Sequence, residues 1–150
     1  NGLYRVNRDN VFNVPFGRYA NPTICDAANL RACSDALAGV SILHEPFESV
    51  LGRAESGDFI YFDPPYLPIS ATSSFTGYSP DGFGLDDHRR LRDTARNLKK
   101  RGVHILLSNS AAPAIRELYA DGFEVSEVLA GRAINASGDG RGKIPELIIR

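Results

Sequence analysis

At residues 59–66 the chain reads FIYFDPPY, four apolar residues followed by an acid, two prolines and a tyrosine. The apolar run has the length and the aromatic content of a buried strand. In open α/β sheets, ligands bind beyond the carboxyl ends of the strands. The acidic turn at Asp63 is therefore predicted to lie at the mouth of a binding site.

Helical and strand patterns alternate on both sides of this stretch. We expect helices over residues 26–37, from residue 48, and over 85–101 and 113–120, and strands over residues 40–43, 59–62, 103–107, 123–129 and 144–149. Such alternation indicates an α/β fold with a parallel sheet. In the long helix, Leu91, Ala95 and Leu98 form the stripe that should face the core.

The composition is that of an ordinary globular domain, with 150 residues, 43% of them hydrophobic, and a net charge of −1. Disordered, collagenous and disulfide-scaffold classes are excluded, and no apolar run is long enough to span a bilayer. Fourteen of the 17 basic residues are arginine. A local site that binds phosphate or guanine is therefore compatible with the small net charge of the protein. The sequence contains no methionine, and we expect an upstream part of the protein to be absent from it.

The two cysteines, Cys25 and Cys33, have no C-x-x-C spacing. Cys33 shares a helical stripe with Leu30 and Leu37, which predicts a reduced thiol in the core. Reduced cysteines favour a cytoplasmic protein.

The first 24 residues differ from the rest, being rich in Asn, Arg, Gly, Pro and aromatic residues. Turn-forming residues 7–10 separate two short alternating segments, which predicts a small hairpin followed by an irregular loop. We therefore divide the chain into residues 1–24 and residues 25–150.

The turn after the apolar run is built from hydrogen-bond acceptors. Two consecutive prolines remove two backbone donors, which leaves carbonyl groups and the Asp63 carboxylate. Asp63 and the Pro64 carbonyl could each accept one N–H of an amino group while Tyr66 covers the face of a planar base. The alternative is a plain turn capped by Asp63, with Tyr66 packed in the core.

The residues Asp63, Pro64, Pro65 and Tyr66 resemble the catalytic D-P-P-Y motif of S-adenosylmethionine-dependent amino methyltransferases. Three further blocks resemble the Dam-type, D12-class DNA N6-adenine methyltransferases: residues 1–5 with 12–19, residues 70–78, and Ser108-Asn109. The resemblance covers essentially the whole chain. It implies an incomplete Rossmann-like methyltransferase sheet, mostly parallel with an antiparallel final strand. It also implies a short hairpin for target recognition within residues 1–24 and a partial catalytic domain over residues 25–150.

The resemblance also implies which residues meet DNA. Arg5 would read a guanine edge and Leu3 and Pro15 would make apolar contacts, an assignment that the donor geometry of arginine supports. Further residues would lie near DNA bases or backbone: Asn1, Asn7, Arg18, Asn135, Arg141 and Lys143. The implied target sequence is GATC. For Arg5 and Arg18, solvation or phosphate contact is the alternative.

The implied cofactor is S-adenosylmethionine. Glu45, Pro46 and Phe47 match the family segment along the cofactor adenine, and Asp63 could also face its methionine part. A plain strand-to-helix turn is the alternative for residues 45–47. The glycine cluster at residues 138–142 opens no helix and is expected to be a flexible turn. The three histidines lack metal-ligand spacing, so we expect no metal.

The expected activity is methyl transfer to N6 of adenine in double-stranded DNA, on a base flipped out of the duplex. We expect a monomer in the cytoplasm of a prokaryote or in cells infected by its phage. Within enzymes, the alternatives are cytosine N4, an RNA base or a protein glutamine as acceptor. A different class also remains, a DNA-binding fragment without catalysis. Upstream sequence with a strand and a Gly-rich turn would discriminate between the two classes.

Overall fold

The computed structural model describes residues 6–14, 20–21, 23–69, 82–131 and 143–150. The chain divides into two compact units, Asn1–Leu43 and His44–Arg150.

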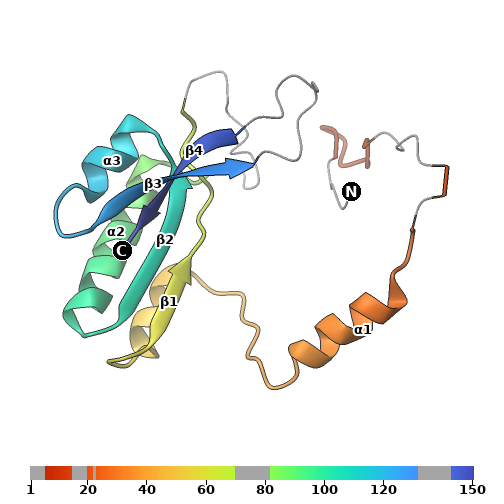
Figure 1. Cartoon of the computed structure of the whole chain (residues 1–150), viewed down its shortest axis with the longest axis horizontal. Helices are drawn as coiled ribbons and strands as arrows, with labels where there is room; N and C mark the ends of the chain where they lie inside the picture. The colour runs from red at the N-terminus through yellow and green to blue at the C-terminus, as the bar shows by residue number, and fades with distance from the viewer. Residues whose placement is uncertain (1–5, 15–19, 22, 70–81, 132–142) are drawn as a thin grey trace. The chain divides into compact units, whose positions relative to one another are not determined.

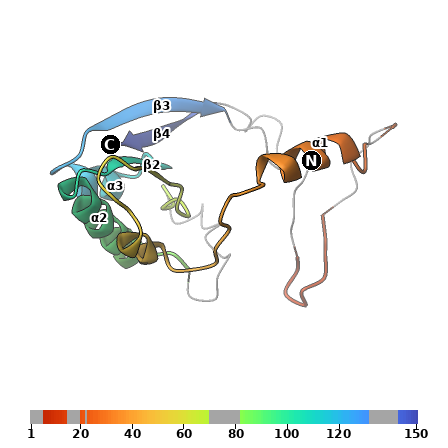
Figure 2. The same cartoon turned by 90° about the horizontal axis from the view of Figure 1, so that it is seen from below.

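Among its described residues, the second unit contains a four-stranded sheet in the order β1-β2-β4-β3 (Figure 1). Its strands are β1 (Phe59–Phe62), β2 (His104–Ser110), β3 (Val125–Gly131) and β4 (Lys143–Ile149). β1 and β2 are parallel, and β4 is antiparallel to both β2 and β3. Figure 2 shows β3 and β4 side by side. Three strands thus share one direction and the final strand is reversed, which confirms the predicted α/β sheet.

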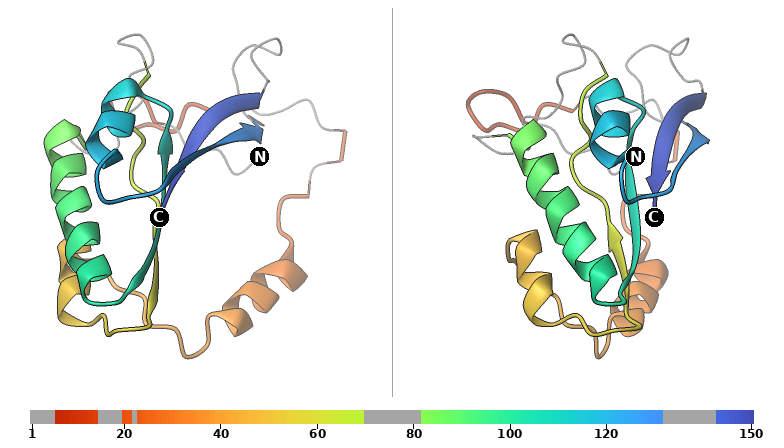
Figure 3. Two further views of the ribbon diagram at one scale, coloured as in Figure 1. Left: turned by 60° about the vertical axis from the view of Figure 1, so that its left-hand side comes forward. Right: turned by 90° about the vertical axis from the view of Figure 1, so that its left-hand side faces the viewer.

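Helices cover one face of this sheet, and α2 (Leu85–Lys100) and α3 (Pro113–Tyr119) lie together there (Figure 3). The short 3-10 helix η1 (Phe47–Gly52) packs against α2. The predicted stripe of Leu91, Ala95 and Leu98 is fully buried in the core. The predicted helices and strands of this unit are therefore confirmed, with shifts of one to three residues at their ends.

Both ends of α2 carry the charges that its dipole favours, Asp86 and Asp87 in the first turn and Lys99 and Lys100 in the last. After the helix, Gly102 adopts a φ of +82°, and a Cβ there would lie 2.5 Å from the Ser56 hydroxyl. The turn therefore requires glycine, and it leads the chain directly into β2.

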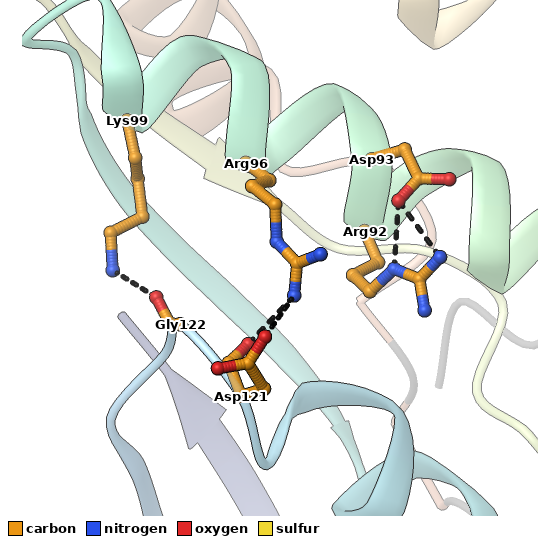
Figure 4. Close-up of polar contacts among 6 residues, drawn as sticks. All are labelled: Arg92, Asp93, Arg96, Lys99, Asp121 and Gly122. Carbon is orange, nitrogen blue, oxygen red and sulfur yellow. Dashed lines mark hydrogen bonds and ion pairs between the residues drawn. The ribbon is translucent and has the colours of Figure 1, made fainter.

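Side chains of α2 also hold the loop between α3 and β3, as Figure 4 shows. The Arg96 guanidinium donates to the carbonyl oxygen of Asp121 at 2.9 Å and to its carboxylate at 3.2 Å. Lys99 donates to the Gly122 carbonyl at 2.9 Å and lies 4.7 Å from the centre of the Phe123 ring. These contacts fix the entry into β3 from the last turns of α2.

Tyr119 is fully buried at the end of α3, yet its hydroxyl has no hydrogen-bond partner in the described part of the chain. Burial accordingly raises the pKa of Tyr119. We expect Tyr119→Phe to increase the free energy of unfolding by about 1 kcal/mol, because the ring contacts remain and an unsatisfied polar group is removed. Urea denaturation of both proteins measures this. A loss of stability would show that the hydroxyl has a partner.

The first unit contains α1 (Ala27–Ala36), whose N-cap residue Asp26 accepts from the backbone N–H of Asn29 at 3.1 Å. The predicted turn at residues 7–10 is present. The Asn7 side-chain oxygen accepts from the backbone N–H groups of Asp9 and Val11, both at 2.9 Å. A bridge between Val6 and Phe12 closes the hairpin.

Two predictions for residues near the junction of the units are wrong. Residues 40–43 form no strand, since no described strand hydrogen-bonds to them and Val40, Ile42 and Leu43 are exposed. An apolar run becomes a strand only when another strand pairs with it. Cys33 is exposed rather than a core thiol, and no residue of α1 is buried. A helical stripe is buried only where another element packs on it.

Of the described helices, none has the length and apolar character that a membrane span requires.

Candidate active site

Asp63 follows the last residue of β1 and lines a pocket of about 380 Å³. The predicted residues Glu45, Pro46 and Phe47 lie on the wall of this same pocket. The rest of the lining consists of Tyr61, Phe62, Pro64, Pro65, Phe83 and Leu91. The structure thus brings together two segments that were assigned to the site separately, at the carboxyl end of β1. The pocket lies within the range of about 300–1,000 Å³ that is typical of small-molecule sites.

Two phenylalanine rings meet on the wall of this pocket. Phe47 and Phe83 pack edge to face, with ring centres 6.1 Å apart. The Arg90 guanidinium lies 5.6 Å from the centre of the Phe47 ring, within cation–π range. The neighbouring rings offer an apolar surface of the kind that binds a planar heterocycle.

Acidic groups complete the lining of the pocket. The Glu45 carboxylate accepts from Arg53 at 2.7 Å, and the hydrogen bonds to Arg53 and Ser49 lower the pKa of Glu45. Glu45 is therefore ionised at neutral pH. Glu45 and Asp63 on one pocket suit a ligand with hydroxyl groups or positive charge.

Asp63 is held by a hydroxyl from the neighbouring strand. The Ser108 hydroxyl of β2 donates to Asp63 Oδ1 at 2.8 Å, and the Tyr61 hydroxyl lies 2.8 Å from Ser108 Oγ. Asp63 Oδ2 has no hydrogen-bond partner among the described residues.

The segment after Asp63 is fastened at Leu67 by the end of β2. The backbone N–H of Leu67 donates to Asn109 Oδ1 at 3.1 Å, and its carbonyl accepts from the Ser110 hydroxyl. Asn109 Oδ1 also accepts from the backbone N–H of Ser110 at 2.9 Å. The side chains of the consecutive residues Asn109 and Ser110 thus satisfy both the backbone N–H and the backbone carbonyl of Leu67. These two hydrogen bonds fix the path of the turn.

His88 of α2 lies next to Asn109 and is fully buried. Its Nδ1 lies 3.4 Å from Asn109 Nδ2, and because the amide nitrogen can only donate, Nδ1 is the acceptor. Nε2 then carries the proton and has no partner in the described part of the chain. The ring also packs against Phe83, with ring centres 4.8 Å apart.

Burial lowers the pKa of His88 below its ordinary value of 6.5, and the charge of Asp87 offsets part of this. The unfolded chain therefore binds a proton near pH 6.5 that the folded chain binds only at lower pH. The stabilisation from neutral His88 is complete above pH 6.5 and is lost as the pH falls from there to the lowered pKa. We expect His88→Gln to flatten the stability curve in this interval, measured by urea denaturation at several pH values. His104→Gln, at an exposed position, is the matched control. An unchanged slope for His88→Gln would contradict the assignment.

Tyr66 is half-buried and is not among the residues that line the pocket. Its hydroxyl lies 3.5 Å from the Glu146 carboxylate, and burial raises the pKa of Tyr66 while the nearby Ser108 hydroxyl opposes the rise. The phenol is therefore neutral, and its ring stands beside the acidic turn without being packed wholly inside the core.

Among the residues predicted to meet DNA, the structure describes two. Asn7 lies in the hairpin turn of the first unit, and Lys143 is the exposed first residue of β4. The others lie outside the described residues: Asn1, Leu3, Arg5, Pro15, Arg18, Asn135 and Arg141. Residues 70–78 and the glycine cluster at 138–142 also lie outside them.

Sequence reasoning assigned no role to Phe83 or to Ser108. Phe83 lies two residues before a long helix, where no pattern marks it as part of a pocket. Ser108 carried a usable signal, because it lies near the carboxyl end of the strand that follows in the sheet, and such ends meet at one edge. Within the described residues, no group of His, Cys, Asp and Glu could hold a metal ion.

Comparison with known proteins adds the family. The family described as D12 class N6 adenine-specific DNA methyltransferase matches residues 1–134. The chain is 46% identical to the type II methyltransferase M1.LlaDCHI of Lactococcus lactis subsp. cremoris over 99% of this chain and 53% of that protein. It is 38% identical to a DNA adenine methylase of Vibrio cholerae, over 99% and 53%, and 34% identical to that of Escherichia coli K12, over 99% and 52%. The chain thus spans about half the length of these relatives.

Proposed function

Because the chain belongs to the D12 class of N6 adenine-specific DNA methyltransferases, we propose that the protein transfers a methyl group to N6 of adenine in double-stranded DNA. The observation that carries this proposal is the position of Asp63, on a pocket that also contains Glu45, Pro46 and Phe47. A non-catalytic DNA-binding role would give no reason for an acceptor cluster to adjoin such a pocket.

The acidic turn would bind the amino group of the target base. Asp63 and the Pro64 carbonyl would accept the two N6 hydrogens, which leaves the nitrogen lone pair free to attack. The base must leave the duplex for this, and unstacking costs a few kcal/mol. Stacking on Tyr66 would offset part of that cost. Catalysis then rests on orientation and on acceptors that bind more strongly as N6 gains positive charge.

The proposed methyl donor is S-adenosylmethionine, which when bound supplies the methyl group from its sulfonium. The pocket fits its chemistry in two ways. The rings of Phe47 and Phe83 offer an apolar surface for the adenine, and the carboxylates of Glu45 and Asp63 suit ribose hydroxyls and cationic groups. We therefore assign Glu45, Pro46, Phe47 and Asp63 to cofactor binding.

We further propose that residues 1–24 read the DNA target, with residues 25–150 as part of the catalytic domain. Arg5 would bind guanine, with Leu3, Pro15, Asn1, Asn7 and Arg18 nearby, and Asn135, Arg141 and Lys143 would lie near the flipped base and the backbone. GATC is the proposed target. The protein would act as a monomer in the cytoplasm of a prokaryote or its phage-infected host.

Incubation of the complete protein with methyl-labelled S-adenosylmethionine and duplex DNA tests the activity. We expect the label in N6-methyladenine after hydrolysis of the DNA, with GATC duplexes preferred over duplexes in which each base is replaced in turn. Label in N4-methylcytosine, in RNA or in protein would replace the proposed acceptor. DNA binding without any transfer would favour the non-catalytic role.

Arg5→Ala is expected to reduce discrimination at one guanine by about 1–3 kcal/mol while affinity for other sequences changes little, because a bidentate base contact acts at one position only. Binding is measured on GATC and substituted duplexes at fixed salt. Arg5 would be a phosphate contact instead if affinity fell equally on all duplexes and the slope of log affinity against log salt concentration became shallower by about one.

A further inference from the structure

Three side chains form a hydrogen-bonded chain that ends on the proposed catalytic carboxylate. Tyr61 lies on β1, Ser108 on the adjacent β2, and Asp63 immediately after β1. The two links, from Tyr61 to Ser108 and from Ser108 to Asp63, are both 2.8 Å long. Ser108, the middle residue of this hydrogen-bonded series, is only 3% exposed, so water has little access to it.

The direction of the protons follows from the chemistry of the groups. The Ser108 hydroxyl has a single proton, which it donates to Asp63 Oδ1. Ser108 Oγ can then act only as acceptor toward Tyr61, whose hydroxyl must donate. Both hydrogen bonds therefore point in the same direction: Tyr61 donates to Ser108, and Ser108 donates to Asp63.

We propose that Ser108 is a positioning residue for methyl transfer, which holds the Asp63 carboxylate by Oδ1 and leaves Oδ2 as the acceptor for the target amino group. The proposal rests on the proposed function of Asp63. Tyr61 has a supporting role, because its donation keeps the Ser108 hydroxyl from rotating away from the carboxylate.

The geometry gives a physical reason why Asp63 needs a hydrogen bond from Ser108. A carboxylate that follows a strand can rotate about its side-chain torsions, and its terminal torsion is broad. A charge-assisted hydrogen bond to one oxygen restricts that rotation. Because the bond comes from the paired strand and not from the turn itself, it also sets the position of Asp63 relative to the sheet. Orientation of this kind contributes mainly to the rate, because the Asp63 carboxylate stays on the pocket without the hydrogen bond and only its orientation is lost.

A purely structural role for Ser108 predicts different measurements. In that case its replacement would lower stability and affect binding and turnover together. A positioning role predicts a fall in kcat alone, recovery when a hydroxyl is retained, and dependence on Tyr61.

The test measures kcat, the KM for S-adenosylmethionine and duplex affinity in the complete protein. We expect Ser108→Ala to lower kcat by about 10- to 100-fold, which is the range for loss of a hydrogen bond to a charged group. KM and duplex affinity should change less than about twofold. Ser108→Thr keeps the hydroxyl and should retain most of the turnover. Tyr61→Phe should lower kcat less than Ser108→Ala, and the double variant should be no slower than Ser108→Ala, because the two groups act in series.

Matched controls are available for both changes. Ser126→Ala removes an exposed hydroxyl from β3, and Tyr119→Phe removes a phenol hydroxyl that has no partner among the described residues. Both should leave kcat unchanged. If Ser108→Ala does not fold, Ser108→Thr and Tyr61→Phe decide, and the latter is safe for folding because Tyr61 is half exposed.

Several results would overturn the proposal. One is a wild-type kcat in Ser108→Ala or, if that variant does not fold, in Tyr61→Phe. Another is an equal loss in Ser108→Thr, and a third is a purely additive effect in the double variant. If the wild-type protein itself transferred no methyl group to adenine, the proposed function would fail and this role with it. Transfer by wild type with unaffected variants removes only the positioning role.

Discussion

Asp63→Ala is expected to reduce methyl transfer by the complete protein at least about 100-fold, while affinity for duplex DNA persists. The variant loses one of the two acceptors proposed for the N6 hydrogens but no residue proposed to read the DNA. It also leaves the Ser108 hydroxyl without the carboxylate that it now binds at 2.8 Å. Transfer of labelled methyl groups and duplex binding are measured on the same preparations.

Asp63→Asn tests whether charge or shape matters. Its amide can turn a donor toward the amino group, so a severe loss is expected as well. Asp93→Asn, at an exposed position on α2, provides the matched control and should keep full activity. Transfer by either Asp63 variant within about tenfold of wild type, or about 1.4 kcal/mol, would remove Asp63 from its proposed role.

Asn109→Ala is expected to lower the free energy of unfolding by about 3 kcal/mol or more. The substitution leaves the backbone N–H groups of Leu67 and Ser110 without their acceptor, and His88 Nδ1 without its donor. Each buried polar group left unsatisfied costs about 1–3 kcal/mol, and Asn109 is fully buried. Turnover should fall too. Leu67 directly follows Tyr66, so the acidic turn shifts when Leu67 loses its hydrogen bond to Asn109.

Urea denaturation of the complete protein measures the effect. Asn97→Ala, at an exposed position near the end of α2, is the matched control and should change stability by less than about 0.5 kcal/mol. A loss below about 1 kcal/mol for Asn109→Ala would indicate that water replaces the amide, and that the path of the turn does not depend on Asn109.

The elements of the second unit were predictable because their signals are local. The apolar stripe of α2, the acids in its first turn, and the lysines and glycine at its end all depend on neighbours within a few residues. The turn at residues 7–10 was predictable for the same reason, since Asn7 hydrogen-bonds to its own neighbours. The errors arose where a pattern needs a distant partner, at residues 40–43 and at Cys33.

The nature of the proposed chemistry was readable from the sequence alone. The order of a short apolar run, an acid and two prolines places a carboxylate at the end of a strand, whatever surrounds it. The choice of Ser108 and Asn109 as the residues that hold this turn depends on β2 pairing with β1, which brings residues more than 40 positions apart into contact. The meeting of Phe47 with Phe83 likewise depends on η1 packing against α2. Local order along the chain specifies a functional group, but its orientation is set by whichever strand and helix fold against it.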